Sequence, residues 1–154
     1  MTTFRSFTSL GICVAVLVGV AVFVRSVPAA PARAVAKASV ATGKSSYGQI
    51  LFDGRGFALY AFTHDMRNKA TCYGECAKKW PPFVVSSRPA AGRGAKALLL
   101  GTTRRPDGKL QATYGGRPLY YYVGDTAPGI VLCQDVDEFG GTWLVLRGKG
   151  ALVR

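Results

Sequence analysis

Two cysteines four residues apart, Cys72 and Cys76, are the first candidates for chemistry in this sequence. On a helix, residues at this spacing lie on one face with about 6 Å between them, a separation that suits a disulfide bond. In an oxidising compartment we expect a structural disulfide between them. A reducible disulfide remains an open alternative, because so small a ring gains little stability from loop closure.

A third cysteine, Cys133, and the only histidine, His64, allow further arrangements. If Cys72 pairs with Cys76, Cys133 is left as a free thiol or as a link to another chain. Cys133 could instead pair with either of the other two cysteines. We predict no cofactor, although these four residues would form a soft site for zinc or copper if the fold brought them together.

The sequence contains no recognised catalytic motif. It has no Gly-x-Ser-x-Gly elbow, no pair of histidines and no phosphate-binding glycine loop. The cysteine spacing differs from the Cys-x-x-Cys of thiol oxidoreductases and from the Cys-x-x-Cys-His of haem attachment. The pattern favours a non-catalytic protein over an enzyme.

A short unit occurs twice in the chain. Tyr60-Ala-Phe62-Thr-His-Asp65 aligns without gaps on Tyr120-Tyr-Tyr122-Val-Gly-Asp125, and a tryptophan follows each copy, at positions 80 and 143. Self-similarity at a fixed spacing indicates repeated structural units. Two short copies cannot form an open solenoid, so we expect them to pack around a pseudo-two-fold axis and share a core.

The tyrosines and aspartates of the two copies have two interpretations. In the structural one, which we favour, each aspartate closes the turn after a strand, and each tyrosine buries its ring and hydrogen-bonds through its hydroxyl. In the functional one, these residues converge on a ligand site between the two halves. The six motif residues of that candidate site are Tyr60, Phe62, Asp65, Tyr120, Tyr122 and Asp125.

The elements that position these residues are expected to be mainly strands. Alternating apolar residues, strand-forming residues and glycine turns predict strands at 47–52, 57–62, 98–103, 109–114, 117–122 and 142–146. Only residues 71–80 look helical, with Thr71 as the predicted N-cap, and residues 86–96 are predicted to be a loop. The fold class is therefore mostly β, with two tandem repeats of short antiparallel strands packed as one pseudo-two-fold domain and one short helix near 71–80.

The N-terminus predicts export. Arg5, an uncharged apolar run at 10–24 and Ala32-Arg33-Ala34 have the order of a secretory signal peptide. We expect cleavage near Ala34, leaving a flexible linker at 35–45 and a domain at 46–148, with repeats at about 46–85 and 97–148. An uncleaved anchor remains the alternative, because residues 6–24 nearly reach the length of a spanning helix. Cys13 lies too early in the apolar run for lipid attachment.

The chain is strongly basic, with a formal net charge of +12, which falls to +9 once the three arginines of residues 1–34 are removed. Such a charge attracts anionic surfaces, although a solvated basic surface is the simpler explanation, which we favour. The expected partners are an anionic envelope surface, a protein or a small ligand. Nucleic acid is not expected, because the chain is exported and its basic residues form no recognition motif. Membrane contact is expected only through 6–24, if uncleaved.

Together these motifs resemble a bacterial secreted-repeat, or predicted-lipoprotein, family defined by Tyr-x-(Phe/Trp/Tyr)-x-x-Asp. The resemblance extends over about 46–148 and includes residues 72–82, 105–114, Gly129 and 138–143. It implies an envelope location and tandem repeats, and it carries no molecular function. The chain departs from the family at 130–135, where Ile-Val-Leu-Cys replaces residues that are often small or polar, so no property of that loop is transferred.

Two functional hypotheses follow from these observations. The first is an exported, non-catalytic envelope module that binds an anionic surface, a protein partner or a small ligand. The second is an extracytoplasmic redox or metal-binding protein that uses Cys72, Cys76, Cys133 and His64. The first requires only an inert disulfide, whereas the second requires cysteines that are reduced, metal-bound or cycling.

Overall fold

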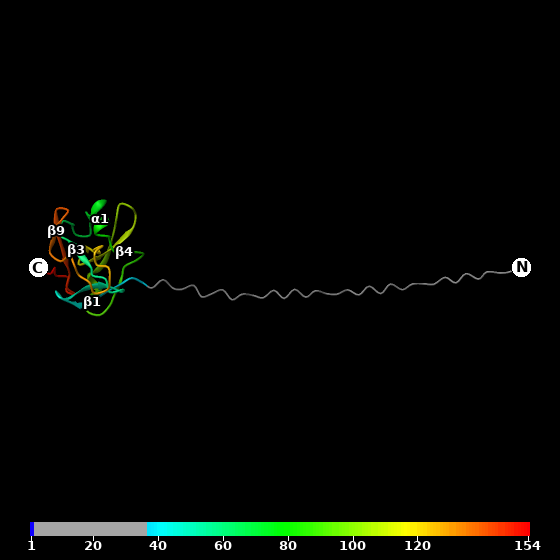
Figure 1. Ribbon diagram of the computed structural model, residues 1–154, viewed down its shortest axis with the longest axis horizontal. Helices are drawn as coiled ribbons and strands as arrows, with labels where there is room; N and C mark the ends of the chain where they lie inside the picture. Colours follow the sequence, from blue (N-terminus) through cyan, green and yellow to red (C-terminus); the bar gives the residue numbers. More distant parts are fainter. Residues whose placement is uncertain (2–36) are drawn as a thin grey trace. The chain divides into compact units, whose positions relative to one another are not determined.

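The computed structural model describes residue 1 and residues 37–154. Apart from residue 1, the predicted signal peptide or anchor at 1–34 lies outside the described residues, and so does Cys13. Residues 37–154 belong to one compact unit. Figure 1 shows this unit as a set of short strands with a single small helix, α1. No helix in the described part of the chain is long and apolar enough to span a membrane.

The prediction of a mostly β fold with one short helix is confirmed. The strands form three small sheets, with orders β2-β1-β5, β3-β10-β9 and β4-β7-β6, and β8 pairs with β7. The elements are β1 (Ser39–Ser45), β2 (Gly48–Asp53), β3 (Tyr60–Phe62), α1 (Glu75–Lys79), β4 (Val84–Val85), β5 (Ala90–Ala91), the 3₁₀ helix η1 (Ala97–Leu99), β6 (Leu100–Arg104), β7 (Leu110–Tyr114), β8 (Arg117–Pro118), β9 (Val136–Glu138) and β10 (Gly141–Val145).

The two repeats meet at a reciprocal backbone contact. The amide of Tyr60 donates to the carbonyl of Tyr120, and the amide of Tyr120 donates to the carbonyl of Tyr60, both over 2.9 Å. The same exchange recurs further out, where Asn68 N–H donates to the Gly116 carbonyl and Gly129 N–H donates to the Gly56 carbonyl. Equal contacts in both directions are what a pseudo-two-fold relation between the repeats requires.

An aromatic stack fills the core between the repeats. Phe62 stacks on Trp143 with ring centroids 4.2 Å apart, Trp143 stacks on Trp80 at 4.0 Å, and Trp80 lies 4.8 Å from Tyr122. The four rings come alternately from the first and second repeats, and both tryptophans are fully buried. Each aromatic contact adds roughly 0.5–1.5 kcal/mol beyond the burial of its area, so the stack holds the repeats together.

The expectation of a flexible linker over 35–45 is wrong for 39–45, which form β1. Six residue pairs, from Val40 with Asp53 to Ser45 with Gly48, join β1 to β2 in antiparallel register. Only Val40 in this strand is fully buried. A strand that needs one buried side chain has no alternating apolar pattern, so its sequence resembles a linker. The folded part also continues past 148, because Val153 is buried and its amide donates to the Val145 carbonyl.

The helix is shorter than predicted and begins differently. It starts at Glu75, its N-cap position is Gly74 with φ 57°, and no side chain caps it. Thr71, the predicted cap, instead hydrogen-bonds to Asp65. Of the predicted strand 117–122, only residues 117–118 form a strand. Further along, Tyr120 pairs with Tyr60 of the other repeat. The two-residue strand β5 lies inside the predicted loop 86–96, and β9 also falls in a segment without predicted structure.

Shortening the protein at its N-terminus tests the role of β1. A chain that begins at Ser46 should lose cooperative thermal unfolding or melt at a much lower temperature than one that begins at Lys37. Burial of Val40 alone is worth about 2 kcal/mol, and the pairing with β2 is lost as well. Circular dichroism melts of the two chains check this. Equal melting temperatures would mean that β1 contributes nothing to the folded state.

Candidate functional site

The motif tyrosines and aspartates form two crossed pairs, each joining the two repeats. Tyr60 Oη donates to Asp125 Oδ2 over 2.7 Å, and Tyr120 Oη donates to Asp65 Oδ2 over 2.8 Å. Both tyrosines are fully buried. Each repeat therefore supplies the acceptor for the other repeat's hydroxyl, a contact that the aligned sequences alone do not reveal.

The remaining carboxylate oxygens of the crossed pairs hold the loops that follow each motif. Asp65 Oδ1 accepts both the amide and the hydroxyl of Thr71 at 2.7 Å. Asp125 Oδ1 accepts the amide of Leu132 at 2.9 Å. All four carboxylate oxygens therefore have donors within the protein. These internal hydrogen bonds are those that the structural interpretation of the motif requires, and a small cavity of about 150 Å³ borders Phe62 and Asp65.

Burial sets the protonation of the crossed pairs. It raises the pKa of the Asp65 and Asp125 carboxyls, while the hydrogen bonds from Thr71 and the tyrosines act in the opposite direction. Burial, together with the adjacent carboxylate, raises the pKa of both Tyr60 and Tyr120 well above the ordinary 10.0. The two tyrosines therefore stay neutral, as hydrogen-bond donors, at an alkaline pH at which an exposed tyrosine would ionise.

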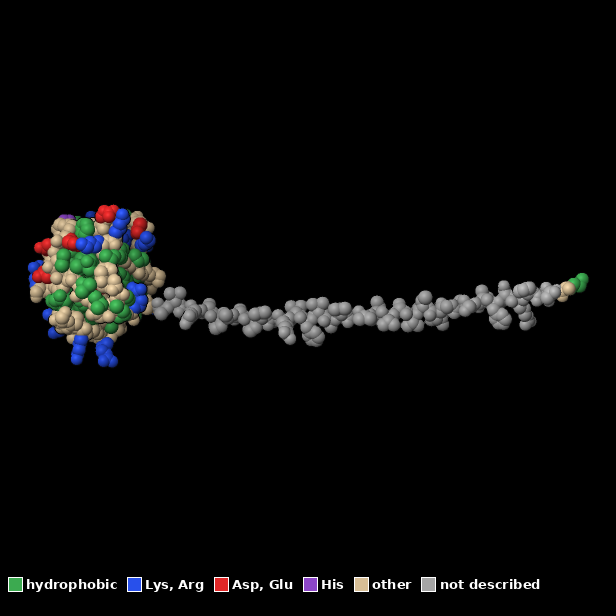
Figure 2. Space-filling model, viewed as in Figure 1, with side chains coloured by type: hydrophobic (Ala, Val, Ile, Leu, Met, Phe, Trp, Pro, Cys, Tyr) green, Lys and Arg blue, Asp and Glu red, His purple; other side chains and the backbone are tan. Residues whose placement is uncertain are grey.

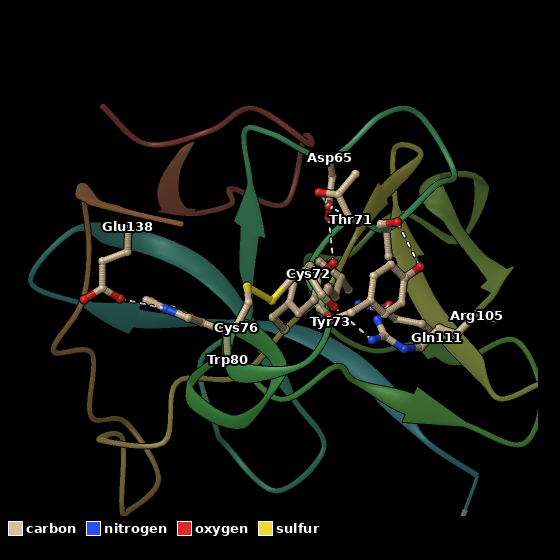
Figure 3. The surroundings of a disulfide bond; sticks show 12 residues. Asp65, Thr71, Cys72, Tyr73, Cys76, Trp80, Arg105, Gln111 and Glu138 are labelled. Atoms are coloured by element: carbon tan, nitrogen blue, oxygen red, sulfur yellow. Dashed lines mark hydrogen bonds between the residues drawn. A yellow bond between two sulfur atoms is a disulfide. The ribbon is translucent and has the colours of Figure 1, made fainter. Parts of the chain in front are cut away.

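The structure contains the disulfide between Cys72 and Cys76, with their Cα atoms 5.3 Å apart and both residues buried. Figure 3 shows how Arg105 approaches the disulfide loop. Its guanidinium donates to the Cys72 carbonyl over 2.9 Å and to Gln111 Oε1 over 2.7 Å, and it lies 4.4 Å from the centre of the Tyr73 ring. Arg105 thereby ties the disulfide loop to the second repeat.

Cys133 is a half-buried free thiol. In each repeat the motif aspartate accepts a backbone amide from the loop that follows it, that of Thr71 in the first repeat and that of Leu132 in the second. Cys72 and Cys133 come directly after these two residues, so they occupy equivalent places in the two repeats. The proposed zinc or copper site at His64 and the three cysteines is not assembled. Cys72 and Cys76 are bonded to each other, and residues 37–154 contain no group of three or more His, Cys, Asp or Glu placed to hold a metal ion.

A surface groove of about 540 Å³ is the strongest candidate for a binding site. It lies where the beginning of β1 passes the turn after β2 and the segment leading into β4. Both repeats contribute, because Tyr121 comes from the second. The groove is lined by Lys37, Ala38, Ser39, Asp53, Gly54, Arg55, Pro82, Phe83, Val84 and Tyr121.

The tight turn at Asp53-Gly-Arg-Gly56 places the polar side chains of this groove. Gly56 has φ 90°, a left-handed conformation that favours glycine. A Cβ at Gly54 would lie 2.4 Å from Ser39 Oγ, so a side chain at this position would require the Ser39 hydroxyl to move. The turn projects Arg55 from one side of the groove while Asp53 stays buried beneath it.

Asp53 is an anchor for its neighbours. Its Oδ1 accepts the amides of Arg55 and Phe57 at 2.9 and 3.0 Å, and its Oδ2 accepts Arg55 Nε at 2.9 Å and Tyr121 Oη at 3.0 Å. The hydrogen bond to Asp53 raises the pKa of Arg55, and burial raises that of Tyr121 above its ordinary value. The groove thus presents a fixed cation and a neutral phenol.

Sequence reasoning missed this groove, because it treated residues 53–56 only as a turn. The available signal was an acidic residue, a basic residue and an aromatic within five positions, at 53, 55 and 57. That signal is weak, since the partner Tyr121 is remote in the chain. Arg105 was missed for a similar reason, because nothing in a turn sequence indicates that its arginine is buried.

Comparison with known proteins identifies one family. The profile of a family described as a secreted repeat of unknown function matches the chain twice, at residues 41–84 and 101–147. The first match begins inside β1, in agreement with the place of that strand in the fold. No curated protein matches the chain, and no solved structure does.

Removing one hydroxyl from the crossed pairs tests their contribution to stability. Tyr60→Phe and Tyr120→Phe should each lower the free energy of unfolding by about 2 kcal/mol, because each leaves one carboxylate oxygen, Oδ2 of Asp125 or Asp65, without its hydroxyl donor. Denaturant titrations measure this. Tyr47→Phe is the matched control, since Tyr47 lies at the edge of the core and its hydroxyl has no hydrogen-bond partner among the described residues. Effects no larger than that control would contradict the assignment.

The raised tyrosine pKa values also predict a loss of stability in alkali. Above pH 10 the unfolded chain releases protons from Tyr60 and Tyr120 that the folded chain retains, so stability is complete below pH 10 and falls as the pH rises. Each tyrosine should contribute about 1.4 kcal/mol per pH unit. Denaturant titrations from pH 9 to 11 should show a shallower decline for Tyr60→Phe than for the wild type. Parallel curves would refute this account.

Proposed function

We propose, because the chain belongs to this family of secreted repeats, that its folded domain is a non-catalytic binding module that works outside the cytoplasm. Its ligand site in this proposal is the groove between β1 and the segment leading into β4. The proposal rests on a difference between the polar groups of the crossed pairs and those of the groove. The crossed pairs use their oxygens internally, whereas the groove keeps cationic groups facing solvent.

The chemistry of the groove favours binding over catalysis. Its one carboxylate, Asp53, accepts four hydrogen bonds and is almost fully buried. A general base must have a free oxygen within reach of the proton that it removes, and Asp53 has none. Tyr121 is held neutral by burial. The remaining polar side chains can orient a ligand but have no evident route to transform it.

The position of the groove gives a reason for the presence of two repeats. Arg55 and Val84 belong to the first repeat and Tyr121 to the second, so the groove exists only when both repeats are folded together. Sites between structural units are common places for ligands, because they combine concave shape with side chains from several segments. On this proposal the repeated motif builds the scaffold, and the turn at 53–56 supplies the function.

The basic character of the domain supports partners of opposite charge. In the view of Figure 2, lysine and arginine side chains lie around the described domain and do not gather in one cluster. A dispersed positive charge attracts anionic envelope material without selecting it. Selection in this proposal comes from the groove, and the remaining charge concentrates the protein near its partners.

Filling the groove tests the proposal. Val84 borders it and is 44% exposed, so Val84→Trp should occupy the cavity without disturbing the core. Leu98→Trp, at a residue that is 96% exposed and outside the groove, is the matched control. In amide NMR titrations with benzoate, phenyl phosphate, benzylamine and benzyl alcohol, we expect at least one probe to perturb groove residues in the wild type and the control, and not in Val84→Trp.

The alternative outcomes are distinct. If none of the four probes perturbs the groove at millimolar concentration, the groove is not a ligand site. If the perturbations gather around the crossed pairs, the ligand site lies between the motifs, and the assignment of the motif to structure is wrong.

A further inference from the structure

We propose that the groove is a receptor for an organic oxyanion, a carboxylate or phosphate carried by an apolar group, and that Arg55 binds the oxyanion. This inference rests on the proposed function of the groove and specifies its ligand. It starts from the way Arg55 is held. Its Nε donates to Asp53 Oδ2, and its two terminal nitrogens have no hydrogen-bond partner among the described residues. The side chain is 69% exposed.

The guanidinium is oriented before any ligand arrives. Asp53 cannot follow Arg55 outward, because its carboxylate is fixed by the amides of Arg55 and Phe57 and by the hydroxyl of Tyr121. The guanidinium carbon also lies 5.1 Å from the centre of the Phe57 ring and 5.6 Å from that of Tyr121. A side chain restrained in this way loses less conformational entropy when it binds.

The groups left free on Arg55 match one kind of ligand. The two terminal nitrogens of a guanidinium form a planar fork that fits the paired oxygens of a carboxylate or a phosphate. Lys37, on the groove wall, adds a second positive charge. These two cations outnumber Asp53, the only acidic residue in the lining, so the groove attracts an anion.

The apolar part of the lining determines the rest of the ligand. Pro82, Phe83 and Val84 line the groove, and Val84 is 44% exposed. An apolar group placed beside the oxyanion would cover this surface and remove it from water, which stabilises the complex in proportion to the area covered. A bare inorganic anion would leave the wall uncovered. The groove therefore fits an oxyanion attached to an apolar body.

Two sources in the envelope offer this chemistry. One is the phosphodiester headgroup of an anionic lipid, where the acyl chains are the apolar part, and the other is a free small organic acid or phosphate. Arg55 recognises the same group in both cases. The sources differ in whether the ligand is presented at a membrane surface, and that difference can be measured.

The test is a titration of the purified protein with four probes, followed by amide NMR shifts of groove residues. Phenyl phosphate and benzoate should bind at least tenfold more tightly than benzyl alcohol, and phenyl phosphate more tightly than inorganic phosphate. Arg55→Lys keeps the charge but loses the fork, and it should weaken binding of phenyl phosphate about tenfold. Arg104→Lys, at an exposed arginine of β6 outside the groove, should leave binding unchanged.

The outcomes separate this inference from the proposed function. If benzyl alcohol binds the groove as tightly as phenyl phosphate, or if Arg55→Lys changes the affinity less than twofold, the oxyanion assignment is overturned while the groove remains a ligand site. Equal affinity for inorganic phosphate and phenyl phosphate overturns the apolar half of the inference. If no probe perturbs the groove, both proposals fail.

Vesicle binding then assigns the source. If sedimentation with phosphatidylglycerol vesicles exceeds that with phosphatidylcholine vesicles and is lost in Arg55→Lys, the ligand is a lipid headgroup. If the wild type and Arg55→Lys sediment equally while phenyl phosphate still distinguishes them, the ligand is a free small molecule. Both results support the oxyanion receptor, whereas an equal loss of sedimentation in Arg104→Lys, which also keeps its charge, would overturn the assignment of the lipid headgroup to the groove.

Discussion

Two carboxylates shielded from water impose the main constraint on this domain. Asp125 is buried and Asp65 is partly buried, so an unpaired charge on either would be costly, and each accepts a tyrosine hydroxyl from the other repeat. The tyrosines that donate are in turn fixed by their reciprocal backbone contact. The aromatic stack can then pack alternately from the two repeats. The site, the loops and the core all depend on this exchange across the pseudo-two-fold axis.

The two repeats share this framework but differ in what surrounds it. The first repeat closes its loop with a disulfide, whereas the second has only Cys133 at the matching place. Trp80 Nε1 donates to Glu138 over 3.1 Å, whereas Trp143 Nε1 is buried without a partner among the described residues. Equivalent positions have thus diverged wherever the framework permits it. The groove follows the same pattern, because its Asp53 and Arg55 occur in the first repeat alone.

Local features of the fold could be predicted from the sequence, and remote ones could not. The disulfide followed from the spacing of Cys72 and Cys76, since both partners lie in one turn of chain. The crossed pairs join residues more than 50 positions apart, and the alignment of two repeats does not tell which copy each tyrosine contacts. The strand β1 could not be predicted, because it fully buries only Val40 and therefore has no alternating apolar pattern. The groove could not be predicted, because it depends on a contact between Asp53 and Tyr121, which comes from the other repeat.

The exchange of partners also bears on how the domain can fold when its chain emerges from one end, as it would during export in an unfolded state. An unfolded chain crosses a membrane from one end to the other, so the first repeat can emerge while the second is still inside. At that moment Tyr60 has no acceptor and Asp65 has no tyrosine, because both partners lie at least 55 residues further along. The aromatic stack lacks alternate rings for the same reason. The core can therefore form only after the last segment has emerged. Until then the first repeat exposes its unpaired groups to proteases and to other chains.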